Sequence, residues 1–502
     1  MLTTFPQLLL KHAAERPTAP ALREKEYGIW QTHSWADLVR LVEQVAAGLH
    51  LAGLQRGEHM VVIGANRPRL YATMLAAQSL GAIPVPLYQD AVGTECVFPI
   101  NNAEVRFAVV EDQEQVDKML EIRDRCPQLA HIYYDDPRGL RNYDQPGLAA
   151  LETLMATGRS HSQQHPGLFK GEVEKGQPDD VASMFFTSGT TGNPKGVYFS
   201  HRQLVLHTMA EASVLGSLDS IRLLGTNDVY MPITPMFHVH AWGIPYVATM
   251  LGIKQVYPGR YEPDLLCRLI KDEKVTFSHC VPTILQMVLA APGAQGHDFG
   301  GLKMIIGGSA LNRSLYEAAK ARGIQLTAAY GMSETCPLIS CGHINDELMA
   351  GSEDERTTYR IKAGVPVPLV EAAIMSADGT LLPADGETQG ELVLRAPWLT
   401  QGYFREPEKG AELWEHGWLH TGDVATIDDF GFIDIRDRIK DVIKTGGEWI
   451  SSLELEDLIS RHPAVREVAV VGVVDPQWGE RPFALLVLRE GQSLDAKGLK
   501  EH

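Results

Sequence analysis

The sequence carries little positive charge and has no cysteine pattern typical of a metal site or a disulfide scaffold. Its 45 lysine and arginine residues are outnumbered by 63 aspartate and glutamate residues, giving a formal net charge of −18 at pH 7. Binding to nucleic acid or to an anionic membrane surface needs a basic face, so we expect neither as a general property. None of the six cysteines forms a Cys-x-x-Cys pair, so a reducing compartment is expected.

The sequence also lacks a recognisable secretory leader and any hydrophobic run long enough to cross a membrane. The three leucines at residues 8–10 are followed by Lys11 and His12, as in an amphipathic first helix. We therefore expect a cytoplasmic protein without integral membrane association, and the sequence leaves peripheral membrane contact and homodimer formation open. With 502 residues, 44% of them hydrophobic, the chain is long enough for more than one domain.

Alternating helix and strand patterns predict a parallel α/β sheet in the first part of the chain. Ser34 can cap a helix that Gly53 ends, and a second helix is expected at 70–80. Short apolar strands are expected at 60–64, 83–86 and 107–110. Residues 136–180 contain a polar stretch and are expected to form an exposed connection.

The second part of the chain has a different pattern. From about Gly364, short alternating segments separated by Asp-Gly turns predict β-hairpins, and we expect a small β-rich subdomain at about 350–435. The triplet Asp429-Phe430-Gly431 is read as a turn, because no kinase catalytic loop accompanies it. A helix at 454–461 and strands at 468–474 and 483–488 then predict a small α+β unit.

Residues 187–196 are the most informative segment and read Thr-Ser-Gly-Thr-Thr-Gly-Asn-Pro-Lys-Gly. The glycines let the backbone turn sharply and point N–H groups at an anion, while the hydroxyls and Lys195 add donors and positive charge. An apolar stretch precedes the segment and a helix-like segment begins at Ser200, a strand–loop–helix context that favours phosphate binding over a plain glycine-rich turn. It is not the common P-loop, because Pro194 precedes the lysine and Gly196 follows it.

Four further motifs follow along the chain. They are Gly307-Gly308-Ser309-Ala310-Leu311, Tyr330-Gly331-Met332-Ser333-Glu334, Trp418-Leu419-His420-Thr421-Gly422-Asp423, and Arg438-Ile439-Lys440-Asp441 with Lys444-Thr445-Gly446-Gly447-Glu448. With residues 187–196, and in the same order, they resemble the motifs of the adenylate-forming superfamily, which contains acyl-CoA synthetases, peptide-synthetase adenylation domains and beetle luciferases. The resemblance runs from about residue 5 to the end of the chain, and the segments around Trp242 and Trp449 look most like fatty acyl-CoA synthetases.

The resemblance implies an α/β fold and a two-step reaction. The large N-terminal domain would contain parallel α/β subdomains and the β-rich subdomain, and a small, incomplete α+β domain would follow it. A carboxylic acid would attack ATP to give an acyl-adenylate and pyrophosphate, and the thiol of CoA would then take the acyl group and release AMP. A medium- or long-chain fatty acid is the first expectation, with an aryl acid still open. An amino-acid adenylation domain is less favoured, because the segment Phe237-His238 lacks the aspartate that would anchor an α-amine.

The resemblance also assigns residues to ATP and Mg²⁺. The β- and γ-phosphates are expected to bind Thr187, Ser188, Gly189, Thr190, Thr191 and Lys195. Glu334 is expected to bind Mg²⁺ together with phosphate oxygens, the alternative being a solvated carboxylate. Adenine is expected to stack on Tyr330, unless that tyrosine is simply part of the core. The other nucleotide contacts are expected from Gly308, Ser309, Ala310, Gly331, Ser333, Asp423, Ile435 and Arg438.

The acyl group and CoA are assigned to residues in the same way. His238 is expected to position the carboxylate or to gate the entry of the thiol. For His240, a purely structural role is expected as much as a functional one. A metal site at this His-x-His pair is disfavoured, because the sequence offers no matching cluster elsewhere. The acyl tunnel is expected to be bounded by His238, Trp242, Gly243 and Trp449, the alternative being that either tryptophan simply packs in the core.

The resemblance also implies a hinge at residues 438–441, centred on Lys440, between a large domain at 1–437 and a small domain at 442–502, and a short charged segment suits such a rotation. The small domain would carry Lys444, Gly446 and Gly447, with the glycines leaving room for the pantetheine arm of CoA. The expected catalytic residues are Lys195, His238, Glu334 and Lys444.

One motif of the superfamily is missing. Its members carry a second lysine near the C-terminus, in a Pro-x-x-x-x-Gly-Lys context, and residues 495–502 do not supply it. The small domain is therefore expected to be incomplete, and a nucleotide-binding module with impaired catalysis is an alternative to the full enzyme. Removing one charge-stabilising group typically costs on the order of 10²- to 10³-fold in rate, which is compatible with slow turnover.

Overall fold

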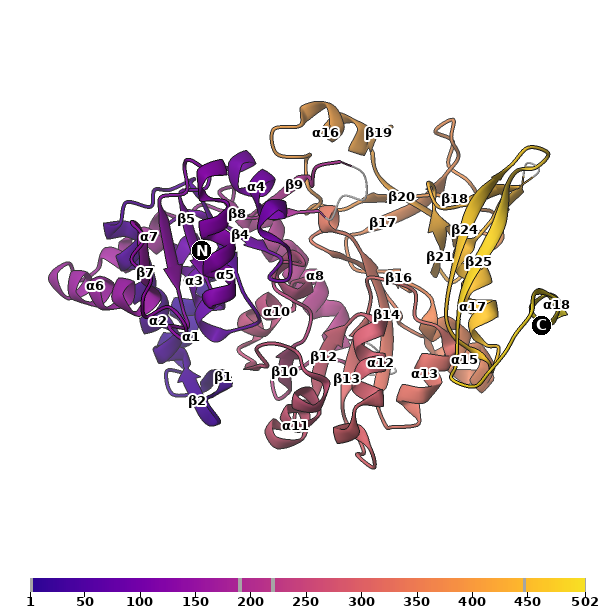
Figure 1. The fold of residues 1–502 in the computed structure, drawn as a ribbon, viewed down its shortest axis with the longest axis horizontal. Helices are drawn as coiled ribbons and strands as arrows, with labels where there is room; N and C mark the ends of the chain where they lie inside the picture. The colour runs from indigo at the N-terminus through magenta and orange to yellow at the C-terminus, as the bar shows by residue number, and fades with distance from the viewer. Residues whose placement is uncertain (1–2, 188–191, 218–221, 446–447, 502) are drawn as a thin grey trace.

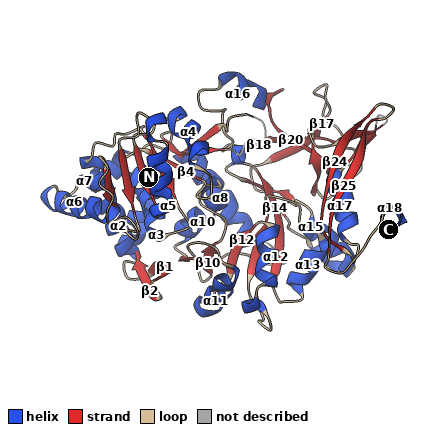
Figure 2. Cartoon of the chain, in the orientation of Figure 1, coloured by secondary structure: helices blue, strands red, loops and turns tan. Residues whose placement is uncertain are grey.

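The structure is a computed structural model that describes residues 3–187, 192–217, 222–445 and 448–501. Figure 1 shows an elongated molecule, with the indigo N-terminal lobe at one end and the yellow C-terminal strands at the other. Helices surround the sheets at the N-terminal end, whereas strands predominate at the C-terminal end (Figure 2). This arrangement confirms the predicted α/β fold class. Among the described residues, no helix combines the length and the apolar character that a membrane span requires.

A parallel sheet with the strand order β4-β3-β5-β6-β7 forms the N-terminal lobe. Its strands are β3 (His59–Ile63), β4 (Ile83–Leu87), β5 (Phe107–Val110), β6 (His131–Tyr134) and β7 (Leu148–Ala150). The strands β3, β4 and β5 confirm the three predicted apolar segments. Pro84 and Pro86 lie in β4 at the sheet edge, where a missing backbone donor is tolerated.

Helices pack around this lobe. The N-terminal helices are α1 (Phe5–Glu15), α2 (Trp35–Leu51), α3 (Pro68–Ser79), α4 (Gly93–Asn102) and α5 (Gln113–Glu121), followed by the 3₁₀ turn η1 (Arg123–Arg125). The Ser34 hydroxyl oxygen accepts from the Asp37 N–H, and the Asp37 carboxylate accepts from the Ser34 N–H. This capping box explains why α2 begins where the sequence predicts it.

Residues 136–180 are not the exposed connection that their composition predicts. They contain β7 and two helices, α6 (Leu151–Gln164) and α7 (Leu168–Lys175). Leu151, Leu154 and Met155 are buried, and α6 packs along α2. The polar run at 160–166 misled the prediction, because it begins on the last turns of α6 and continues past its end.

A central sheet of nine strands follows, with the order β16-β15-β14-β13-β12-β10-β11-β1-β2. The strands are β1 (Pro20–Glu26), β2 (Ile29–Ser34), β10 (Val229–Pro232), β11 (Lys254–Tyr257), β12 (Phe277–Cys280), β13 (Lys303–Ile306), β14 (Gln325–Gly331), β15 (Leu338–Cys341) and β16 (Val365–Pro366). Neighbours from β1 to β14 pair in parallel, and the outer pairs are antiparallel. The loops that follow β10, β13 and β14 therefore leave the sheet at the same edge, where open α/β sheets bind ligands.

Further helices connect the central strands. They are α9 (Val239–Trp242), α10 (Ile244–Leu251), α11 (Pro263–Glu273), α12 (Pro282–Ala290), α13 (Arg313–Lys320), α14 (Asp346–Ala350) and α15 (Glu353–Ile361), with the 3₁₀ turns η2 (Pro292–Ala294) and η3 (Ser333–Thr335). The turn α9 is left-handed, because Val239, His240, Ala241 and Trp242 all have φ between 44° and 60°. Each such residue costs roughly 1–2 kcal/mol relative to a right-handed conformation, so the surrounding packing must hold this turn in place.

The segment at 187–196 connects two antiparallel strands, β8 (Val181–Phe186) and β9 (Gly196–Ser200). Helix α8 (His201–Ser217) follows β9 directly. The predicted strand and helix are both present, but the strand–loop–helix context is wrong, because β9 lies between loop and helix. The chain folds back and pairs Gly196 with Phe186, so the loop is the tip of a hairpin.

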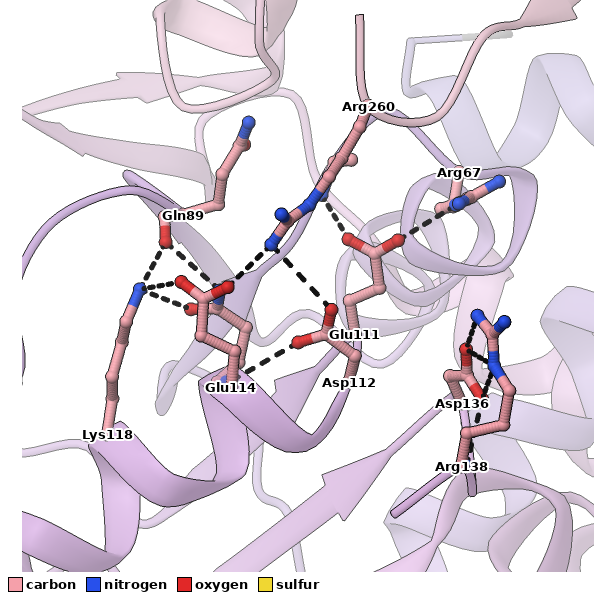
Figure 3. Close-up of polar contacts among 11 residues, drawn as sticks. Arg67, Gln89, Glu111, Asp112, Glu114, Lys118, Asp136, Arg138 and Arg260 are labelled. Carbon is pink, nitrogen blue, oxygen red and sulfur yellow. Dashed lines mark hydrogen bonds and ion pairs between the residues drawn. The ribbon is translucent and has the colours of Figure 1, made fainter. Parts of the chain in front are cut away.

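Polar contacts tie the N-terminal lobe to the central sheet (Figure 3). Arg260, which follows β11, pairs with Glu114 at 2.7 Å and with Asp112 at 3.9 Å, both at the start of α5. Arg67 pairs with Glu111 of the same lobe at 2.9 Å and with Glu24 on β1 of the central sheet at 3.8 Å. The Arg260 pairs and the Arg67–Glu24 pair therefore connect the two sheets.

The C-terminal third is rich in strands. One sheet contains β17 (Glu371–Met375), β18 (Gly390–Arg395), β19 (Trp414–Glu415), β20 (Trp418–Ile427) and β21 (Ile433–Arg438), with α16 (Pro407–Leu413) before β19. The last sheet contains β22 (Ile443–Thr445), β23 (Glu448–Ile450), β24 (Val465–Asp475) and β25 (Gly479–Leu488), with α17 (Ser452–Ser460) and α18 (Ala496–Glu501). The predicted hairpins, the helix near 454–461 and both following strands are confirmed. Residues 353–361 are helical, so the strands of the β-rich part begin later than residue 350.

Candidate active site

Thr187 and Lys195 close the base of the loop at 187–196. The Thr187 N–H donates to the Lys195 carbonyl at 2.9 Å, and the Lys195 N–H donates to the Thr187 hydroxyl oxygen at 3.2 Å. The predicted phosphate ligands Ser188, Gly189, Thr190 and Thr191 lie outside the described residues. The ammonium group of Lys195 lies 4.5 Å from the centre of the Tyr403 ring, so the tyrosine face holds this cation at the end of the loop.

Glu334 lies directly beyond Tyr403. It is buried in η3, and its Oε1 accepts a 2.8 Å hydrogen bond from the Tyr403 hydroxyl. Burial raises the pKa of Glu334, while the Tyr403 hydrogen bond and the nearby Lys195 charge oppose that rise. The structure therefore brings together Lys195 and Glu334, two residues 139 positions apart in sequence, through one tyrosine.

The surroundings of Glu334 fit the donor set expected for Mg²⁺. The described residues contain no group of three or more His, Cys, Asp or Glu side chains that could hold a metal ion alone. Mg²⁺ is commonly held by one or two carboxylates and completes its shell with substrate phosphates and water. A single carboxylate next to the loop at 187–196 matches that requirement.

A second polar group joins Tyr330, Asp423 and Arg438. The Tyr330 hydroxyl donates a 2.6 Å hydrogen bond to Asp423 Oδ2, and Arg438 Nε lies 3.5 Å from Asp423 Oδ1. Asp423 and Arg438 face each other across β20 and β21. Burial raises the pKa of Asp423, and the Tyr330 hydrogen bond and the Arg438 charge oppose that rise. The side chain of Arg438 is 59% exposed, so its remaining donors are free to reach a ligand.

The loop after β13 lies beside Tyr330. Gly308, Ser309 and Ala310 are exposed, and Gly308 has φ 77°, a conformation that favours glycine. Gly331 and Ser333, on the other side, are partly buried. Ile435, predicted to touch the base, lies on β21 and packs against the main hydrophobic core.

A mainly apolar cavity of about 60 Å³ opens between these loops. It is lined by Glu211, Trp242, Ile244, Ile305, Gly307, Gly308, Ala329, Tyr330, Gly331, Pro337 and Leu338. A Cβ atom at Gly307 would lie 3.5 Å from Trp242 Cη2, so the indole ring packs directly against this backbone. The cavity thus runs from the residues predicted to bind the nucleotide to Trp242, one of the residues predicted to bound the acyl tunnel.

The two histidines of the His-x-His pair have different environments. His238 is exposed, and its ring centroid is 3.9 Å from that of Phe237. His240 is fully buried in the left-handed turn, and neither ring nitrogen has a hydrogen-bond partner among the described residues. Its ring packs edge-on against Phe185. Burial lowers the pKa of His240 to about 3, so this histidine is neutral and structural in character.

The residues predicted to form the hinge and to act in the reaction with the CoA thiol lie further along the chain. Lys440 lies in a turn after β21, in which the N–H groups of Asp441 and Val442 both donate to the Arg438 carbonyl. Lys444 is exposed on β22, and its N–H donates to Glu480 Oε2 at 2.8 Å. In the part of the chain that the structure describes, no hydrogen bond or ion pair links Lys444 to Tyr330, Glu334 or Asp423. Gly446, Gly447 and the side chain of Trp449 lie outside the described residues.

Sequence reasoning missed three polar residues at this site. Tyr403 contacts both Lys195 and Glu334. Glu391 on β18 accepts from the Gly422 N–H at 2.9 Å, next to Asp423. Glu211 on α8 lines the cavity. None of them lies in a motif that the sequence analysis used, so no local pattern predicts their role.

Comparisons with known proteins agree with the motifs. The profile of the AMP-binding enzyme family matches residues 9–404, and that of the AMP-binding enzyme C-terminal domain matches 454–502. The chain is 34% identical to a long-chain-fatty-acid–CoA ligase of Thermus thermophilus, over 93% of the chain and 83% of that protein. It is 33% identical to a medium-chain-fatty-acid–CoA ligase of Ectopseudomonas oleovorans, over 95% of the chain and 86% of that protein. It is also 36% identical to a 3-methylmercaptopropionyl-CoA ligase of Ruegeria lacuscaerulensis, over 91% and 83% respectively.

Solved structures share the fold at lower identity. A crystal structure of an anthranilate CoA ligase with anthranoyl-AMP matches with a TM-score of 0.82 and 22% identity, covering 99% of this chain and 89% of that one. ATP-bound MatB from Rhodopseudomonas palustris matches with a TM-score of 0.81 and 24% identity, over 99% and 91% respectively. These two structures therefore support the arrangement of sheets described above.

Proposed function

Because this chain belongs to the AMP-binding enzyme family of adenylate-forming, AMP-releasing acid–thiol ligases, we propose that it joins a medium- or long-chain fatty acid to coenzyme A. The fatty acid and ATP would form an acyl-adenylate and pyrophosphate, and CoA would then displace AMP to give the acyl-CoA. The observation that carries this proposal is the mainly apolar cavity that runs from Tyr330 and Gly308 to Trp242 and Ile244. Apolar walls suit an aliphatic chain, and adenylation would take place where the cavity reaches Tyr330 and Gly308.

Residues around the loop at 187–196 would stabilise charge in the first step. The acid oxygen is a weak nucleophile, so the protein contributes by orienting the reactants and by stabilising the negative charge that develops on the phosphates. Lys195 would supply a positive charge to the β- and γ-phosphates, held in place by the Tyr403 ring. Glu334 would hold Mg²⁺ together with phosphate oxygens, and the bound ion would supply Lewis-acid stabilisation of that charge.

The group of Tyr330, Asp423 and Arg438 would hold the nucleoside. The Asp423 carboxylate already accepts one hydrogen bond and keeps lone pairs for the ribose hydroxyls. Arg438 would donate to the ribose or the α-phosphate. Adenine would lie between the Tyr330 ring and the backbone at Gly308, Ser309 and Ala310.

The second step would use the small C-terminal unit. Residues 442–502 have a four-stranded sheet and a small hydrophobic core of their own, built around Ile443, Ile459, Val465 and Val470. We propose rotation about residues 438–441, which would bring Lys444, Gly446, Gly447 and Trp449 toward the acyl-adenylate. His238 would position the carboxylate where the thiol enters.

Two alternatives follow from the relatives and from the sequence. One similar structure is an anthranilate CoA ligase, so aryl acids belong in the test. A nucleotide-binding module with impaired catalysis is the second alternative, and pyrophosphate release distinguishes it from the enzyme. The cavity has only about 60 Å³ with Trp242 in its present position, so a long acyl chain requires this side chain to move.

The test is acid-dependent pyrophosphate release across straight-chain acids from short to long, with benzoate as the aryl probe. Each acid is assayed with and without CoA, and products are identified by mass. Acyl-CoA from medium or long straight chains supports the proposal. A preference for benzoate would mean that the substrate is an aryl acid and not a fatty acid. ATP binding without pyrophosphate release would mean that the protein is a nucleotide-binding module and not an enzyme.

A further inference from the structure

A buried carboxyl group faces the acyl cavity and plays no part in the chemistry described above. Glu211 lies on α8 with only 1% of its surface exposed, yet it lines the cavity together with apolar residues such as Ile244, Ile305 and Leu338. Its Oε2 atom has no hydrogen-bond partner among the described residues. Leaving such a group unsatisfied costs roughly 1–3 kcal/mol, so an apolar side chain here would make the protein more stable.

A hydrogen-bond donor lies beside this acceptor. His207 is one helical turn earlier on α8, 1% exposed, and its Nε2 accepts a 3.0 Å hydrogen bond from the Leu338 N–H. The neutral ring must therefore carry its proton on Nδ1. Burial lowers the pKa of His207 to about 3, which keeps the ring neutral at pH 7. Nδ1 also lacks a partner among the described residues and lies 3.8 Å from Glu211 Oε2.

The spacing of these two atoms suits one bridging oxygen. An oxygen atom can lie about 2.8 Å from both atoms, which are 3.8 Å apart, and so form two ordinary hydrogen bonds. Gly243 keeps the space beside them free of a side chain. A Cβ atom there would lie 3.1 Å from Glu211 Oε2 and 3.5 Å from His207 Nδ1.

The chemistry of the pair favours a neutral hydroxyl. Burial raises the pKa of Glu211 well above its usual range, which favours the uncharged form of the carboxyl group. A hydroxyl can accept from the His207 Nδ1–H and donate to Glu211 Oε2 without creating a charge. An ammonium group would have to be desolvated and would need an ionised partner, and a methyl group would leave both protein atoms unsatisfied.

We propose that Glu211 and His207 recognise a hydroxyl group on the acyl chain, so that the enzyme prefers a hydroxylated aliphatic acid to the unsubstituted acid of the same length. The proposal rests on the proposed acyl-CoA ligase function and narrows its substrate class. A site built to bond a substrate hydroxyl discriminates strongly against the analogue that lacks it, because the buried polar groups are then left unpaired.

The test compares kcat/KM for straight-chain acids with that for their monohydroxy derivatives, with the hydroxyl placed at each position in turn. For wild-type protein we expect one hydroxylated isomer to exceed the unsubstituted acid by at least about tenfold. Glu211→Leu should abolish or reverse that ratio. Met209→Leu, at an exposed position on the same helix, should leave it unchanged. The ratio is taken within one protein, so a general loss of folded enzyme does not move it.

The outcomes separate this proposal from the function on which it rests. Acyl-CoA formation with no preference for any hydroxylated isomer in the wild-type protein overturns the role of Glu211 and leaves the ligase function standing. An unchanged ratio in folded Glu211→Leu also overturns it. If Glu211→Leu does not fold, Glu211→Met replaces it, because methionine has a similar volume but no oxygen to accept the hydrogen bond, and the hydroxyl preference should again be lost. Failure to form acyl-CoA from any acid overturns the ligase function, and this proposal with it.

Discussion

The hydroxyl group of Tyr330 donates a 2.6 Å hydrogen bond to Oδ2 of Asp423. This bond joins the C-terminal end of β14, in the central sheet, to the β-rich sheet. Tyr330 is on β14 and Asp423 is on β20, so the contact crosses between two separate sheets. Both residues belong to motifs predicted to bind the nucleotide. The contact therefore fixes the relative position of two motifs that are far apart in sequence.

The first prediction concerns this hydrogen bond. Tyr330→Phe keeps the aromatic ring but removes the donor to Asp423, which is 8% exposed. A loss of about 1–2 kcal/mol corresponds to a factor of roughly 5–30, and we expect kcat/KM for ATP to fall by that factor. Pyrophosphate release measured against ATP concentration gives the value. Tyr27→Phe, at a side chain that is 64% exposed, serves as the control. Equal values for the two variants would contradict a role of this contact in nucleotide binding.

The second prediction concerns Glu334. Glu334→Gln keeps an oxygen to accept from the Tyr403 hydroxyl, so the fold should be retained, but it removes the charge that would hold Mg²⁺. We expect turnover to fall on the order of 10²- to 10³-fold and the Mg²⁺ concentration for half-maximal rate to rise. Glu347→Gln, on an exposed position of α14, is the matched control. Unchanged Mg²⁺ dependence in Glu334→Gln would remove the metal assignment.

The third prediction separates the two half-reactions. Lys444 has no hydrogen bond or ion pair with the Tyr330–Asp423 or Lys195–Glu334 groups in the described structure, so it should matter after a domain rotation. Lys444→Ala should slow thioester formation more than adenylation. Single-turnover measurements of acyl-adenylate formation and of its conversion by CoA give the two rates. Equal slowing of both steps would count against the rotation, and the exposed Lys271→Ala should slow neither.

The fourth prediction concerns pH and His240. Its pKa is about 3 in the folded protein and about 6.5 when unfolded, because burial disfavours the charged ring. The unfolded state therefore binds an extra proton as the pH falls below about 6.5. The stability that the neutral histidine allows is fully present above that pH and is lost progressively as the pH falls toward 3. Between pH 7 and pH 5, this one residue should lower the free energy of unfolding by about 2 kcal/mol.

His240→Phe should remove this part of the acid sensitivity. The buried ring packs against Phe185 and Tyr246, and a phenyl ring has no charge to acquire. We expect the midpoint of thermal unfolding to fall less between pH 7 and pH 5 than in the wild type. His416→Phe is the control, because His416 also has a positive φ but its side chain is 51% exposed. The same fall in midpoint for wild type and His240→Phe would refute the assignment.

Much of the fold could be predicted from sequence, because apolar periodicity and capping residues act locally. Two examples illustrate this. Ser34 caps α2, and the residues Phe107–Val110 form β5, as the local sequence predicts in both cases. The wrong predictions concern segments whose structure depends on tertiary packing. Helix α6 forms because Leu151, Leu154 and Met155 pack against α2, a contact that its polar composition conceals.

The candidate site divides in the same way. Lys195, Glu334, Tyr330 and Asp423 were found through motifs, and the structure brings them into two neighbouring groups. Tyr403 could not be found, because its role comes from two contacts with residues far away in sequence. Glu211 was missed for a related reason, since only the folded cavity shows that a carboxyl group on α8 faces apolar residues.

The central claim is that one protein first adenylates an aliphatic acid and then passes the acyl group to CoA. The most direct measurement incubates the protein with ATP, Mg²⁺ and a straight-chain acid without CoA, identifies the products by mass, and then adds CoA. We predict acyl-adenylate and pyrophosphate in the first stage, followed by equal amounts of acyl-CoA and AMP. Bound ATP that stays intact, or an acyl-adenylate that CoA does not convert, would contradict the account.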